Sequence, residues 1–184
     1  MGRGALALKG SKRRPWLELR RCETERTYLD HQLRRLRKLH DGPIEAQWDR
    51  IPSEGFYDKV RLRLHGEDLY RVYELLYPRD EKRINKQVLT IAGFDGLIAL
   101  WADNGRWWGR IGRIDGRYNT DEFTALQEWI EELGVQCYLS NMNSEGDRPS
   151  LRFKDIGARQ LQAVLRENIH PSLRSKIKPA DTSR

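Results

Sequence analysis

An acid and an amide close an apolar stretch near the middle of the chain. Residues 93–105 read GFDGLIALWADNG, so Asp103 and Asn104 precede the last glycine. We expect a helix here, which places both side chains at its C-terminal end, where unpaired carbonyls and the helix dipole disfavour a carboxylate. A bound divalent cation would reverse that balance, so both residues are candidate metal ligands. A buried helix with a glycine cap and a solvated Asp-Asn turn explains the same pattern without a metal.

A second group of candidate residues consists of cations at alternate positions. Residues 59–65 alternate basic with apolar side chains, so a strand there would have one cationic face and one apolar face. Arginine binds guanine edges and phosphates well, whereas an ordinary solvated sheet face needs no ligand. The candidate DNA contacts on this and two further predicted strands are Lys59, Arg61, Arg63, Arg106, Arg110, Arg152 and Lys154.

Short strands and amphipathic helices must position these side chains. The hydrophobic periods and turn residues predict one group of elements before the central helix and a similar group after it. The first group is a strand at 15–22, a helix at 24–39, a strand at 56–65 and a helix at 67–77. The second is a strand at 106–114, a helix from 120 to 133, strands at 136–142 and 150–156, and a helix at 158–169. Residues 82–91 are expected to link the two groups.

The two groups repeat one another. At a constant offset, Glu25, Thr27, Leu29, Leu33 and Leu36 match Glu122, Thr124, Leu126, Ile130 and Leu133. A second constant offset matches Leu62, Leu64, Val72, Leu75 and Leu76 to Leu151, Phe153, Leu161, Val164 and Leu165. We therefore expect two α+β half-domains, residues 1–91 and 92–184, each with helices on one face of an antiparallel sheet. The alternative is that any two amphipathic helices can be aligned in this way.

The sequence LIALWADNG at residues 97–105, followed by Arg106, resembles the second motif of the LAGLIDADG homing endonucleases. The order of elements, αββαββα with the motif helix leading, is also similar to that family. The resemblance implies two pseudo-repeated half-domains whose sheets form a DNA-binding saddle, with the helices on the opposite face. The first half-domain would lack its leading helix, because Met1 lies only two residues before the matching Arg3.

The resemblance also implies an active centre that binds Mg²⁺ through the acid before the last glycine of each motif. That acid is replaced by Asn104 and by Arg3, while Asp103 lies where the family often has a second acid. Lys82 and Lys176 match the lysines that reach the active centre, although both also read as surface lysines in basic segments. Because Asn is a weak ligand and Arg repels a cation, we expect little or no cleavage with Mg²⁺.

Composition agrees with a polyanionic partner. The chain has 34 Lys and Arg against 27 Asp and Glu, a net charge of +7 and a pI near 9.6. Cys22 and Cys137 lie far apart without a CxxC pair, and no signal peptide or membrane span is predicted, so we expect a cytoplasmic protein with reduced thiols.

Two functions follow as hypotheses. The first is a homing-endonuclease-like protein that binds double-stranded DNA, favoured as a monomer with a homodimer as the alternative, and encoded in an intron, an intein or another mobile element. The second is a non-catalytic binder on the same fold, either a maturase that binds structured intron RNA or a transcription regulator.

Overall fold

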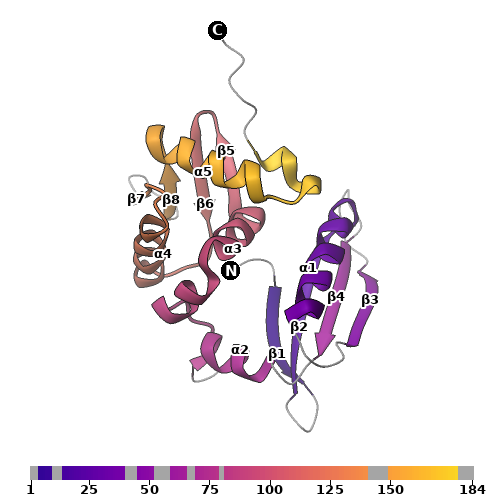
Figure 1. Ribbon diagram of the computed structural model, residues 1–184. Coiled ribbons are helices and arrows are strands. Elements are labelled where there is room, and N and C mark those ends of the chain that lie inside the picture. The colour runs from indigo at the N-terminus through magenta and orange to yellow at the C-terminus, as the bar shows by residue number, and fades with distance from the viewer. Residues whose placement is uncertain are drawn as a thin grey trace. The chain divides into compact units, whose positions relative to one another are not determined.

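The chain folds into two compact units, one of residues 3–81 and one that contains residues 82–184. The computed structural model describes residues 4–9, 14–39, 45–51, 59–65, 69–78, 81–140 and 149–177. Each unit contains a four-stranded antiparallel sheet with helices packed on it (Figure 1). None of the helices in the described ranges is both long enough and apolar enough to cross a membrane.

The first unit opens, among its described residues, with two paired strands. Its elements are β1 (Gly4–Lys9), β2 (Arg14–Cys22), the short 3₁₀ helix η1 (Glu23–Glu25), α1 (Arg26–Leu39), β3 (Glu45–Ile51), β4 (Lys59–His65) and α2 (Leu69–Leu76). The strand order in the sheet is β1-β2-β4-β3, so β4 lies between β2 and the edge strand β3. This order brings residues from three segments of the chain onto one sheet face.

Helix α1 forms the core of the first unit with the apolar face of the sheet. Leu29 and Leu33 of α1 are buried against Val60, Leu62 and Leu64 of β4. The alternation of apolar and basic residues at 59–65 predicted a strand with one buried face, and the structure confirms this. Every second side chain of β4 packs under α1, and the others point away from it.

The second unit repeats this plan with the motif helix in front. Its elements are α3 (Lys86–Asn104), β5 (Gly105–Trp108), β6 (Ile111–Asp115), α4 (Thr120–Glu132), β7 (Tyr138–Ser140), β8 (Ser150–Phe153), α5 (Asp155–Asn168) and the 3₁₀ helix η3 (Pro171–Lys176). The sheet order β5-β6-β8-β7 is equivalent to that of the first unit. Leu151 and Phe153 of β8 are fully buried, as are Leu126 of α4 and Leu161 of α5.

The predicted α+β class with two antiparallel sheets is confirmed. Leu29 and Leu126, which the sequence repeat pairs, are both fully buried in the helix that follows the second strand of their unit. Leu62 and Leu151, the pair from the fourth strands, are also both fully buried. For these two pairs the offsets correspond to equivalent core positions, but Val72 of α2 is 41 % exposed, whereas its match Leu161 of α5 is fully buried.

Several predicted boundaries were wrong. Helix α3 begins at Lys86, within the segment expected to be a link, because Asn85 accepts a hydrogen bond from the backbone N–H of Val88 and caps it. Gly93 interrupts the helix with φ of 49°, in the left-handed region that favours glycine. The last strand ends at Phe153 rather than residue 156, so the predicted strand residue Lys154 is the N-cap of α5.

Strand β3 was missed. Its sequence, EAQWDRI, alternates polar and apolar side chains over only a few residues, and its ladder partner β4 lies beyond an intervening segment. Pairing with β4 places Asp49 opposite Arg61 and Gln47 opposite Arg63. The missed strand therefore contributes to the face on which the predicted DNA contacts lie.

Candidate nucleic-acid interface

Arg61 and Arg63 lie on the face of the first sheet that α1 leaves open. They alternate along β4 with the buried Val60, Leu62 and Leu64. Lys59, the third predicted contact on this strand, begins β4, but its side chain lies outside the described set. The described part of the predicted cationic face therefore consists of two arginines and their neighbours on β2 and β3.

Those neighbours include two carboxylates. Arg61 donates from Nε to Asp49 Oδ1 at 2.6 Å and from Nη2 to Asp49 Oδ2 at 2.7 Å. Arg63 donates from Nε to Glu18 Oε2 at 3.1 Å, and its Nη1 lies 3.4 Å from Asp49 Oδ2. Arg20, opposite Arg61 on β2, also hydrogen-bonds Glu18. The cations of β4 therefore share this face with acids, because cross-strand pairing places a carboxylate beside Arg61 and another beside Arg63.

The ion pairs change the acidity of both carboxyls. The hydrogen bond from Arg61 is the main cause that lowers the pKa of Asp49. Burial raises the pKa of Glu18, but hydrogen bonds from Arg63 and Arg20 outweigh it, and the net shift is downward. Both residues are therefore carboxylates at neutral pH.

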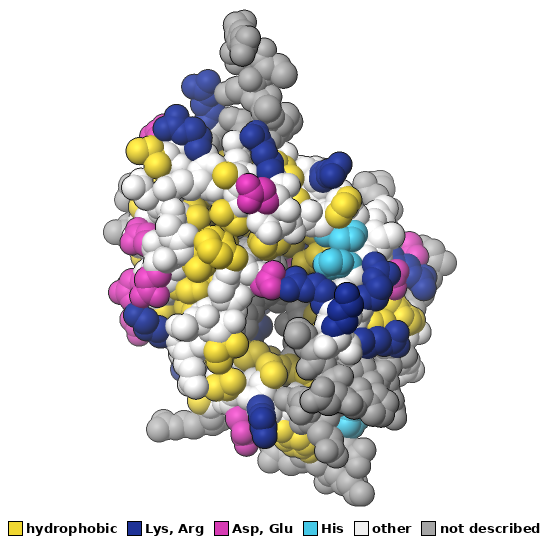
Figure 2. Space-filling view, in the orientation of Figure 1, with side chains coloured by type: hydrophobic (Ala, Val, Ile, Leu, Met, Phe, Trp, Pro, Cys, Tyr) yellow, Lys and Arg dark blue, Asp and Glu magenta, His cyan; other side chains and the backbone are white. Residues whose placement is uncertain are grey.

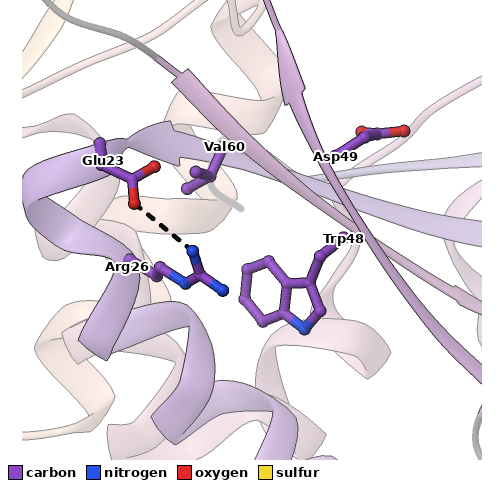
Figure 3. Close-up of a pocket in the computed structure, with 5 residues that line it drawn as sticks. All are labelled: Glu23, Arg26, Trp48, Asp49 and Val60. Atoms are coloured by element: carbon purple, nitrogen blue, oxygen red, sulfur yellow. Dashed lines mark hydrogen bonds and ion pairs between the residues drawn. The ribbon is translucent and has the colours of Figure 1, made fainter.

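Asp49 belongs to the open face although it neighbours a hollow on the helix side. Glu23, Arg26, Trp48, Asp49 and Val60 line this hollow of about 330 Å³. Figure 3 shows Trp48 directed toward Arg26, whose guanidinium lies 5.1 Å from the indole ring, and Asp49 directed to the other side of β3. Because side chains alternate along β3, Trp48 lies on the helix side of the sheet and Asp49 faces the arginines on the other side.

Among the described residues, the open face of the second sheet has one acid, Asp115. Arg106 on β5 is 63 % exposed and its Nε lies 2.8 Å from Asp115 Oδ2 on β6. Arg113, which the sequence reading did not single out, also hydrogen-bonds Asp115. Arg152 on β8 lies between Arg113 and Tyr138 in the ladder and has no acidic partner among the described residues.

Three further side chains extend this second face. The Nζ of Lys154 lies 5.0 Å from the centre of the Tyr138 ring. Arg110 is exposed in the turn between β5 and β6. Trp108, two residues after Arg106 on the same strand, is 70 % exposed. Trp101 is fully buried and contacts the half-buried Trp107, with the ring centroids 5.1 Å apart and the rings tilted by 58°, whereas Trp108 presents its indole to solvent.

Two of the predicted catalytic residues, Asp103 and Asn104, form the C-terminal end of α3. Asn104 donates from Nδ2 to the hydroxyl of Tyr118 at 3.1 Å. A pocket of about 290 Å³ here is lined by Lys82, Asn104, Tyr118 and Glu122 together with neighbouring backbone and side chains. Burial raises the pKa of Tyr118 to about 12, with the nearby Glu122 adding to the shift, so the phenol stays protonated. Burial also lowers the pKa of Lys82, against the attraction of Glu122.

Lys176 lies at the same end of the motif helix. Its Nζ is 3.4 Å from the carbonyl oxygen of Gly105, and its own carbonyl accepts hydrogen bonds from the indoles of Trp101 at 3.1 Å and Trp107 at 3.0 Å. Leu173 of η3 is buried, which anchors the segment further. The structure thus brings Lys82 and Asn104 into one pocket and Lys176 to the adjoining Gly105.

The described residues do not form a complete Mg²⁺ site. Mg²⁺ requires near-octahedral oxygen coordination and is usually held by one or more carboxylates. At the end of α3 the protein offers the half-buried Asp103 and the amide oxygen of Asn104, with Lys82 and Lys176 nearby. Within the described ranges, no group of three His, Cys, Asp or Glu side chains is placed to hold a metal. Arg3, the first-half counterpart of Asn104, lies outside those ranges.

The outer surfaces of the helices also carry charge. Arg34, Arg37 and Lys38 are exposed on α1, and Figure 2 shows Lys and Arg side chains gathered over this helix. Helix α4 carries the opposite charge, and its exposed acids are Asp121, Glu128, Glu131 and Glu132. Part of the net positive charge therefore lies away from the sheet faces, and a test of the interface has to separate the two surfaces.

The comparisons with known proteins give fold-level matches only. No family model and no curated protein sequence matches the chain. Among solved structures, the homing endonuclease I-WcaI bound to its DNA recognition sequence matches with a TM-score of 0.71 and 12 % identity, over 95 % of this chain and 81 % of that one. The structure of I-DmoI in complex with DNA and Ca matches with a TM-score of 0.60 and 14 % identity, over 95 % of this chain and 90 % of that one. The chain therefore has the fold of the LAGLIDADG homing endonucleases, to which its central motif is similar.

Proposed function

We propose that the chain binds double-stranded DNA sequence-specifically through the open faces of its two sheets. The observation that carries this proposal is the position of Arg61, Arg63, Arg106 and Arg152 on the faces that the helices leave uncovered. A β-sheet surface can enter the major groove, and arginine side chains there contact guanine edges and phosphates. The homing endonuclease I-WcaI, which shares the fold, was solved bound to its DNA recognition sequence.

We propose further that cleavage with Mg²⁺ is weak or absent. Asn104 occupies the position of the motif acid, and its amide is already engaged by Tyr118. Lys82 and Lys176 bring positive charge to the same helix end, which favours a phosphate there and disfavours a metal cation. The structural neighbours include I-DmoI in complex with DNA and Ca and in complex with DNA and Mn.

The interface can be tested with two variants that remove equal charge. The sheet variant R106A/R152A/K154A removes three cations from the open face of the second sheet. The helix variant R34A/R37A/K38A removes three cations from the outer surface of α1. Binding of the full chain to a 30-bp duplex is measured by fluorescence anisotropy between 50 and 300 mM salt. The salt slope is the slope of the logarithm of the association constant against the logarithm of the salt concentration. Each lost phosphate contact makes this slope shallower by about 0.9.

We expect the sheet variant to lose at least about tenfold in affinity and about two units of salt slope, and the helix variant to change far less. The reverse order would place the interface on α1. Equal losses would mean that only net charge matters, which would also contradict the proposal. Circular dichroism of each variant establishes that the fold is intact.

A non-catalytic binder of structured RNA is the second candidate. The replaced acid at Asn104 and the basic surface of α1 favour it. Competition of a folded RNA against the 30-bp duplex, at equal length and salt, separates the two. Preference for RNA, lost in the α1 variant, would favour the maturase-like function, whereas preference for the duplex favours the first proposal.

A further inference from the structure

We propose that Glu18 and Asp49 are specificity-determining residues that prevent Arg20, Arg61 and Arg63 from acting as general phosphate contacts. The inference rests on the proposed DNA-binding function and extends it by assigning different tasks to the two sheet faces. The first sheet would discriminate between sequences, and the second would supply most of the sequence-independent attraction.

The guanidinium of Arg61 is held by both carboxylates. Two of its nitrogens hydrogen-bond the two carboxylate oxygens of Asp49, and its third, Nη1, lies 3.8 Å from Glu18 Oε2. A bidentate pair of this kind fixes the plane of the guanidinium. Arg61 therefore cannot turn toward a phosphate without breaking two charge-assisted hydrogen bonds.

The side chains of this network are partly buried. The side-chain exposures of Glu18, Asp49, Arg61 and Arg63 are 14 %, 29 %, 21 % and 23 %. A surface ion pair between two mobile, solvated side chains contributes little, whereas a partly buried bidentate pair is held in place. The network is thus a preorganised surface on the sheet.

The balance of charge differs between the two faces. On the first sheet, the three arginines of the network face two carboxylates, which leaves one net positive charge. Among the described side chains of the second, Arg106, Arg113 and Arg152 face one acid, Asp115, which leaves two net positive charges, and Lys154 adds a third. Among the described side chains, the second face therefore attracts phosphates more strongly, and the carboxylates of the first face repel them.

Carboxylates on a groove-facing surface have a positive use in recognition. Asp and Glu accept hydrogen bonds from the N4 amino group of cytosine, as arginine donates to the N7 and O6 of guanine. A wrong base pair would leave the remaining acceptor positions of these carboxylates without a donor at a buried interface, and that cost is the source of discrimination. A surface of paired Arg and carboxylate groups therefore favours matching sequences over DNA in general.

The test uses variants that neutralise one carboxylate without changing its shape. E18Q and D49N each alter the network, and E74Q makes the same charge change at an exposed acid of α2, outside it. Two probes are used with the full chain: a fixed 30-bp duplex of mixed sequence, and a pool of randomised 30-bp duplexes that is sequenced after selection.

We expect E18Q and D49N to bind the fixed duplex about fivefold more tightly, with a salt slope about one unit steeper, because an arginine is released to contact phosphate. The selected pool should carry less sequence information than with the unmodified protein. E74Q should leave the affinity, slope and selected sequence unchanged. Thermal unfolding shows whether each variant folds, and D49N/R61Q, which removes both members of one pair, should restore the original salt slope without restoring selection.

Unchanged selection and salt slope in folded E18Q and D49N would overturn the inference and leave the ion pairs as purely structural contacts. A pool that the unmodified protein does not enrich at all would instead overturn the proposed function itself. If one single variant fails to fold, the other single variant and D49N/R61Q still decide the question.

Discussion

Arg61 and Asp49 form a bidentate ion pair across the edge of the first sheet, with Nε to Oδ1 at 2.6 Å and Nη2 to Oδ2 at 2.7 Å. The pair joins the best-predicted strand of the unit, β4, to β3, which the sequence reading missed. It turns a row of cations into a network of alternating charge.

Because of this ion pair, the stability of the fold depends on pH in the acidic range. Arg61 lowers the pKa of Asp49 in the folded state from a usual value of 3.8, so the pair stabilises the fold above that value and the contribution is lost as pH falls through the folded pKa. The urea midpoint of D49N should lie below that of the unmodified protein at pH 7. The two midpoints should converge between about pH 5 and pH 2. A constant difference across this range would show that Asp49 stabilises the protein by other means.

Asn104→Asp should be tolerated at the end of α3. The Tyr118 phenol, whose pKa is raised to about 12, is protonated at neutral pH and can donate to the new carboxylate as it now accepts from Asn104. We expect this variant to nick a supercoiled plasmid carrying the selected sequence in the presence of Mg²⁺, and no more, since the motif resemblance matches the second acid to Arg3, which supplies no carboxylate. Agarose electrophoresis separates nicked from linear plasmid. Linear product from the unmodified chain would contradict the assignment of Asn104 as the defective position.

Lys176 is expected to affect binding more than stability. Its backbone carbonyl, which accepts from Trp101 and Trp107, survives in K176M, while the ammonium beside Gly105 is lost. The midpoint of thermal unfolding should change by an amount equivalent to less than about 1 kcal/mol, with a severalfold loss of duplex affinity. L173A is the matched structural control, because removing a buried leucine should cost about 2–5 kcal/mol. A K176M variant that melts like L173A would make Lys176 a structural residue.

Trp108 should report DNA binding by fluorescence. Of the tryptophans whose side chains the structure describes, Trp108 alone is exposed, at 70 %, and it lies next to Arg106. The fluorescence at the longest emission wavelengths should therefore come largely from Trp108. Addition of the 30-bp duplex should quench or shift that emission, and W108F should lose the response while it keeps its fold. A response that is unchanged in W108F would come from another tryptophan, such as the half-buried Trp16 beside His65, and would contradict a DNA contact at Trp108.

The sequence predicted those features of the fold that depend on the local period of apolar residues. The alternation in β4 identified the side of the strand on which Arg61 lies, and the offset pairs Leu29 with Leu126 and Leu62 with Leu151 identified the equivalent cores. Lys82 and Asn104, singled out independently, line the same pocket.

The partners of these residues could not be predicted, because they depend on pairing between distant segments. Asp49 faces Arg61 only through the register of β3 with β4, and EAQWDRI alone is too short a signal to establish that register. Tyr118 meets Asn104 only after the β5–β6 hairpin has formed. The exposure of Trp108 likewise depends on which face of β5 the helices cover.

Selection from a pool of randomised 30-bp duplexes by the unmodified full chain tests the central claim most directly. The account predicts enrichment of one extended sequence over the input, with the bound duplex left uncut in Mg²⁺. A bound pool with the same sequence composition as the input would contradict sequence-specific recognition by this protein.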